Sequence, residues 1–122
     1  MGAEASKPQP GAKLQVIGAG LPRTGTASFA AALSILLKGP VYHGGTQICV
    51  SGDPYHVKTW MDIISHMPYK SPADRTYVMK KLKEVTDGYV AVADTPHAQF
   101  VPELMELYPE AKVVCTVRDV DA

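Results

Sequence analysis

The stretch GAGLPRTGTASF, residues 18–29, lies between a run of aliphatic residues and a run rich in alanine and leucine. Leu14 to Ile17 read as a buried strand, and from Thr26 onward the apolar residues recur at helical spacing. A strand that turns through glycines into a helix leaves the free N–H groups of the helix N-terminus at the end of the strand, where they favour a phosphate. The stretch therefore predicts a phosphate-binding loop within an α/β fold.

The rest of the chain supports an α/β fold. Asp53 followed by Pro54, and Ser71 followed by Pro72, are typical of helix N-termini, because Asp and Ser cap helices and proline suits the first helical position. Short apolar runs in DGYVAVAD and AKVVCTVRD predict two further strands, with a helical segment over residues 100–107 between them. Three short apolar strands that alternate with helices indicate a parallel sheet covered by helices.

Composition limits the classes of partner. Residues 1–12 are expected to form a flexible tail and residues 13–122 a single domain.

Twelve basic and twelve acidic residues cancel in net charge, so no overall electrostatic field attracts nucleic acid. The two cysteines form no disulfide framework, and Cys115 is expected to be a buried thiol in an apolar run. No stretch approaches the roughly 20 apolar residues that span a bilayer, so a cytoplasmic protein is expected.

The N-terminal segment MGAEAS fits the pattern for N-myristoylation of Gly2. A single myristoyl chain gives only marginal, reversible membrane binding, so it would act as a weak tether. The alternative interpretation is a short unmodified leader.

The loop departs from two common nucleotide-binding patterns. In the dinucleotide pattern G-x-G-x-x-G, Arg23 stands where the third glycine belongs. In the Walker A pattern, Thr26 replaces the lysine and Ala27 replaces the hydroxyl residue that binds magnesium. We therefore expect a phosphate that is bound without a metal, with a charge from Arg23 and hydroxyl donors from Thr24, Thr26 and Ser28.

The segment GLPRTGTASF resembles the 5′-phosphosulfate loop of sulfotransferases, and YPEAKVVCTVRD, Tyr108 to Asp119, is similar to the start of the 3′-phosphate site of that family. The pair resembles the sulfotransferase-like P-loop proteins common in fungi and other eukaryotes, over residues 14–122. This resemblance implies a P-loop NTPase-like three-layer fold and 3′-phosphoadenosine 5′-phosphosulfate as cosubstrate, with no metal. It implies that the donor is held by Pro22, Arg23, Thr24, Gly25, Thr26, Ser28 and Arg118.

Sulfuryl transfer also needs a base for the attacking hydroxyl or amine, and an in-line arrangement with donors aimed at the developing charge. Arg23 is expected to stabilise the leaving phosphate. Asp94 and His97 follow the second apolar strand, where the base region of the family falls, and His43 in YHGG is a third candidate. His97 is preferred, because an unperturbed imidazole titrates near neutrality, and Asp94 is the next choice. An ordinary polar surface or helix-cap role remains the alternative for each histidine.

The resembling family continues beyond the position of Ala122 with a tryptophan, a serine that shares the 3′-phosphate, and further helices. Residues 13–122 are therefore expected to be the N-terminal portion of a truncated sulfotransferase-like domain. Whether this short chain is active stays open. Two alternative functions stay open. One is a non-catalytic nucleotide- or phosphate-binding module. The other is an NAD-dependent oxidoreductase or epimerase/dehydratase, which predicts an acidic residue about 20 residues past the glycines, whereas SILLKGPVYHGG has none. A small-molecule acceptor is expected, of unspecified identity.

Overall fold

The computed structural model describes residues 7–20, 26–94 and 96–115. Over these ranges the chain forms a parallel sheet of four short strands in the order β2-β3-β1-β4. The strands are β1 (Val16–Gly18), β2 (Val41–His43), β3 (Ala91–Ala93) and β4 (Lys112–Val114). The α/β class and the parallel sheet predicted from the sequence are confirmed.

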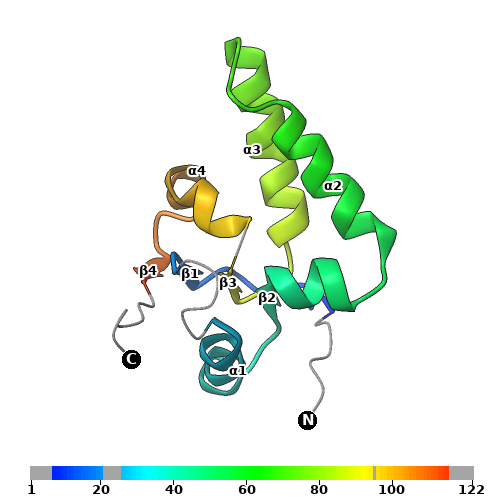
Figure 1. Ribbon diagram of the computed structural model, residues 1–122. Helices are drawn as coiled ribbons and strands as arrows, with labels where there is room; N and C mark the ends of the chain where they lie inside the picture. The colour runs from blue at the N-terminus through cyan, green and yellow to red at the C-terminus, as the bar shows by residue number, and fades with distance from the viewer. Residues whose placement is uncertain (1–6, 21–25, 95, 116–122) are drawn as a thin grey trace, which may run out of the picture.

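Helices cover both faces of this sheet (Figure 1). α1 (Thr26–Leu36) lies on one face, and α2 (Pro54–Ser65), α3 (Pro72–Thr86) and α4 (Val101–Leu107) lie on the other. Two shorter helices, η1 (Gly45–Val50) and η2 (His97–Phe100), follow β2 and β3. The three-layer arrangement predicted for the P-loop fold is therefore confirmed.

The alternation of side chains along the strands divides the core into two layers. The layer beneath α1 contains Val16, Ala30, Leu33, Val41, Ala91 and Ala93. The layer on the opposite face contains Ile17, Tyr42, Trp60, Ile63, Val78, Leu82, Val92, Phe100 and Leu104. Neighbouring residues of one strand thus enter opposite layers, which explains why the two central strands, β1 and β3, are apolar throughout.

The two helix starts predicted at proline residues are found at the predicted positions. α2 begins at Pro54 with Asp53 as its N-cap, and the Asp53 carboxylate accepts a hydrogen bond from the Tyr55 N–H at 2.9 Å. α3 begins at Pro72 with Ser71 as its N-cap, but the Ser71 side chain makes no capping hydrogen bond. The two caps are therefore energetically different although both match the same pattern.

We expect Asp53→Ala to lower the free energy of unfolding by about 1 kcal/mol, because the substitution leaves an amide of the first helical turn without its acceptor. Ser71→Ala serves as the matched control and is expected to change stability little, since no hydrogen bond is lost. Urea denaturation of the two variants and the wild type measures both values. Equal losses at the two positions would contradict the assignment of capping to Asp53.

The sheet corrects two expectations. Three strands were predicted, and β2 is a fourth, formed by Val41–His43 alongside β3. Cys115 is exposed rather than buried. It follows β4, an edge strand in this structure whose residues are all exposed, so an apolar run at this position does not lie inside the core.

The last residues of the predicted N-terminal tail contact the domain in this structure. The Gln9 N–H donates to the Gly88 carbonyl at 2.8 Å. Gly88 has a φ of +88°, and a Cβ at this position would come within 2.7 Å of Pro8. The glycine therefore provides both the backbone conformation and the space that this contact needs.

Candidate functional site

The connections that follow β1 and β3 diverge at one edge of the sheet. These two strands are neighbours, yet α1, which follows β1, packs on one face, and α4, which follows β3, packs on the other. In α/β sheets, such a divergence at the carboxyl ends of adjacent strands opens a crevice where ligands bind. The crevice is therefore expected between the residues that follow Gly18 and those that follow Ala93.

β1 and β3 approach each other closely at this edge. A Cβ on Gly18 would lie 2.8 Å from the Val92 carbonyl oxygen and 3.2 Å from the Phe29 ring. A larger residue at position 18 would thus push the start of the loop away from β3 and from α1. A glycine at position 18 therefore allows the end of β1 to pack closely against β3 and α1.

The structure describes only part of the predicted donor site. Pro22, Arg23, Thr24, Gly25 and Arg118 lie outside the described residues. The backbone of Thr26 begins α1, and Ser28 lies exposed on the first turn of that helix. In the sequence, the predicted loop thus falls between the end of β1 at Gly18 and the start of α1 at Thr26.

Asp94, the second choice among the candidate bases, follows β3 directly and is buried, with 8% of its surface exposed. Its φ is +71°, a conformation that a non-glycine residue rarely adopts. Its Oδ2 accepts a hydrogen bond from the Gly45 N–H at 3.0 Å. Its Oδ1 is buried and has no hydrogen-bond partner among the described residues, although buried carboxylate oxygens are normally satisfied.

His43, at the end of β2, lies beside Asp94. Its Nε2 is 3.5 Å from Asp94 Oδ2, and its Nδ1 lies 3.1 Å from Thr46 Oγ1. β2 and β3 are neighbouring parallel strands, so their carboxyl ends bring His43 and Asp94 to the same edge. The roles of Gly45 and Thr46 were not predicted from the sequence, and the short segment HGGT directly after an apolar triplet was the available signal.

His97, the preferred candidate base, lies in the core rather than in the crevice. Its ring is fully buried, 4.6 Å from the Tyr42 ring and 4.8 Å from the Trp60 ring between centroids, and neither ring nitrogen has a hydrogen-bond partner in the described part of the chain. Burial, with smaller contributions from His43 and His56, lowers the pKa of His97 to about 3. The preference for His97 was based on an unperturbed imidazole, whereas this ring is buried in the core and Asp94 lies at the carboxyl ends of the strands.

A hydrogen-bonded chain of aromatic residues lies next to His97. The Trp60 Nε1–H donates to the Tyr42 hydroxyl at 3.0 Å, since an indole is only a donor. The same hydroxyl forms a hydrogen bond of 2.6 Å with His56 Nδ1. Burial raises the pKa of Tyr42 well above its usual value and lowers that of His56. This chain joins β2 to α2 and thereby supports the strand that carries His43.

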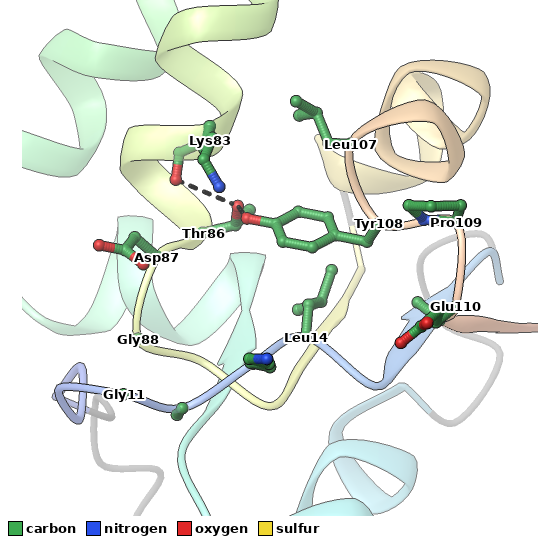
Figure 2. Close-up of a pocket in the computed structure, with 13 residues that line it drawn as sticks. Gly11, Leu14, Lys83, Thr86, Asp87, Gly88, Leu107, Tyr108, Pro109 and Glu110 are labelled. Carbon is green, nitrogen blue, oxygen red and sulfur yellow. Dashed lines mark hydrogen bonds between the residues drawn. The ribbon is translucent and has the colours of Figure 1, made fainter.

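A cavity of about 480 Å³ lies at the opposite edge of the sheet (Figure 2). Its lining includes Leu14, Gly88 and Ala111, which precede β1, β3 and β4. Figure 2 shows the Tyr108 phenol reaching toward Thr86 on α3, and the two hydroxyl oxygens are 2.7 Å apart. Because it lies at the amino ends of the strands, this cavity is separate from the carboxyl ends, where Asp94 lies.

Among the helices in the described part of the chain, none has the length and apolar character needed to cross a membrane. Gly2, the predicted myristoylation site, lies outside the described residues.

Comparison with known proteins gives two matches. A family model described as a sulfotransferase domain matches residues 15–122. The "Ava biosynthesis cluster protein M" of Aspergillus versicolor is 35% identical over 106 residues, which cover 86% of this chain and 38% of the relative. The chain thus spans well under half the length of that relative.

Proposed function

Because the chain belongs to the sulfotransferase domain family, we propose that it binds 3′-phosphoadenosine 5′-phosphosulfate and transfers the sulfuryl group to a hydroxyl or amine of a small molecule. Members of this family generally use this donor. The observation that carries the proposal is the buried Asp94, whose Oδ1 has no described partner at the edge where the predicted phosphate loop begins. A carboxylate in this position can accept a proton from an acceptor bound in the crevice.

The described residues are compatible with such a donor. β1 ends at a glycine that packs against β3, and α1, an eleven-residue helix, begins at Thr26. The N–H groups of its first turn would be the donors to a phosphate. Arg23 and the hydroxyls of Thr24, Thr26 and Ser28 would hold the 5′-phosphosulfate, and Pro22 and Gly25 would shape the loop. Arg118 would hold the 3′-phosphate.

The proposed reaction is a displacement at sulfur. The acceptor oxygen or nitrogen attacks sulfur, a new bond forms to it, and the bond from sulfur to the bridging phosphate oxygen breaks. The electron pair of that bond remains on the 5′-phosphate of 3′-phosphoadenosine 5′-phosphate, where Arg23 stabilises the charge. The proton of the acceptor passes to Asp94 Oδ1 and then to solvent, so atoms and charge balance.

We expect the chain to bind 3′-phosphoadenosine 5′-phosphate, and Arg23→Ala or Arg118→Ala to abolish this binding, because each removes a cation that contacts one of the two phosphates. Isothermal titration calorimetry of the wild type and both variants measures the effect, with circular dichroism to verify folding.

Arg75→Ala is the matched control, since Arg75 on α3 is exposed and pairs with Glu106 on α4, away from the crevice. Its affinity for the nucleotide should equal that of the wild type. A folded wild-type chain that does not bind the nucleotide, or loss of binding in the Arg75 variant alone, would overturn the proposal.

A further inference from the structure

The hydrogen bonds around His43 determine which of its ring nitrogens carries the proton in the neutral form. The Thr46 backbone N–H donates to His43 Nδ1 at 3.3 Å. A backbone N–H is only a donor, so Nδ1 must be the acceptor and cannot carry a proton while this bond is made. The neutral ring therefore carries its proton on Nε2, the nitrogen that faces Asp94.

The same oxygen of Asp94 thus accepts one hydrogen bond and has His43 Nε2 as a close neighbour. The Gly45 N–H donates to Oδ2 at 3.0 Å, and His43 Nε2 lies 3.5 Å from that atom. The second distance is long for a hydrogen bond, and catalytic contacts are often long before substrate binds and shorten in the complex. Oδ2 thus accepts from Gly45 and lies near His43 Nε2, whereas Oδ1 has no hydrogen-bond partner among the described residues.

Gly45 provides the space that this arrangement requires. A Cβ at this position would lie 3.0 Å from Asp94 Oδ2 and 3.3 Å from the His43 Cε1 atom. The close packing of backbone, imidazole and carboxylate restricts rotation of the carboxylate about its Cβ–Cγ bond. The His43 side chain is itself only 14% exposed, so its own position is restricted as well.

We propose that His43 is a positioning residue for Asp94. It holds Oδ2 through Nε2–H and so presents Oδ1 to the proton of the acceptor. The inference rests on the proposed sulfuryl transfer, but the His43–Asp94 pairing is a property of the chain that can be measured without any nucleotide. Loss of a partner that orients a reacting group typically costs about 10–100-fold, judged by the outer-shell residues of metal sites.

The first test is turnover of 3′-phosphoadenosine 5′-phosphosulfate, with 4-nitrophenol and with water as acceptors. We expect His43→Leu to lower kcat by about 10–100-fold with KM for the donor unchanged. His43→Gln, whose side-chain amide can donate to Oδ2, should recover a large part of the rate. His66→Leu, which replaces a histidine at the C-cap of α2, is the matched control and should turn over like the wild type.

The second test is independent of activity. Long-range ¹⁵N–¹H NMR in mildly alkaline buffer reports which nitrogen of His43 is protonated and how its Nε2–H resonance responds to Asp94→Asn. We expect protonation at Nε2 and a clear shift of that resonance in the variant.

The outcomes separate the two proposals. Two NMR results would overturn the positioning role: a neutral His43 with its proton on Nδ1, or an Nε2 resonance that does not change in Asp94→Asn. Two kinetic results would also overturn it: a wild-type kcat in His43→Leu, or a wild type that binds nucleotide but turns over neither acceptor. A wild type that fails to bind 3′-phosphoadenosine 5′-phosphate would overturn the proposed function, whatever the NMR experiment shows of the pairing.

Discussion

Asp94→Asn is expected to lower the rate of sulfuryl transfer by about 10²–10⁴-fold, the usual contribution of a general base. The amide has nearly the same shape as the carboxylate, and its oxygen can still accept the hydrogen bond from the Gly45 N–H. The amide is not basic enough to accept a proton, so the variant has no general base for the acceptor. The affinity for 3′-phosphoadenosine 5′-phosphate should remain unchanged, because the predicted nucleotide contacts come from other residues. The transfer rate is measured as the rate at which 3′-phosphoadenosine 5′-phosphate forms from the donor. The affinity for this nucleotide is measured separately by calorimetry.

Asp62→Asn is the matched control for this variant. Asp62 lies on α2 and accepts a hydrogen bond from the Tyr77 hydroxyl on α3, in a different part of the molecule. The same chemical change should leave the transfer rate at the wild-type value. A wild-type rate in Asp94→Asn would mean that the base lies elsewhere, and parallel losses of rate and nucleotide affinity would indicate a structural role.

The helix starts could be predicted because their causes are local. Asp53 caps an amide two residues away, and Pro54 and Pro72 restrict only their own φ. The same reasoning found the strand that leads into the loop, since Gly18 ends an apolar run. The phosphate-loop residues themselves remain predictions, because they lie outside the described part of the chain.

β2 could not be predicted in the same way, because three residues carry too little pattern. Val41–His43 is a strand because it pairs in register with Ala91–Ala93, fifty positions along the chain. The proximity of His43 to Asp94 depends on that pairing, so it could not be predicted from the spacing of residues in the sequence. The burial of His97 could not be predicted for a related reason. Burial beside Trp60 and Tyr42 results from how α2 packs on the sheet, and that burial changes the chemistry of the imidazole.

The burial of His97 is expected to make the fold sensitive to acid. The pKa of His97 is about 3 in the folded chain, against 6.5 for an ordinary histidine. Between these values the unfolded chain binds a proton that the folded chain does not, so stability is fully present above about pH 6.5 and falls as the pH drops toward 3. The slope approaches about 1.4 kcal/mol per pH unit. Burial also lowers the pKa of His56, which adds to the effect in the same direction.

His97→Leu should remove the larger part of this dependence. From about pH 7 to pH 5 the wild type is expected to lose roughly 2 kcal/mol more of its unfolding free energy than the variant does. Leucine fills a similar volume and its side chain has no polar atoms, and the ring nitrogens that it replaces make no hydrogen bond to the residues that the structure describes. Urea denaturation at the two pH values measures the difference.

Leu104→Val is the control, because it perturbs a fully buried residue of the same core layer without removing a titratable group. It should lower stability by a similar amount at both pH values, which separates a change in proton uptake from a change in packing. If wild type and His97→Leu instead show the same dependence on pH, then the folded chain admits a proton to His97 as readily as the unfolded chain does. The imidazole would then be accessible, and the choice between Asp94 and His97 as the base would have to be made again from the rates of the two variants.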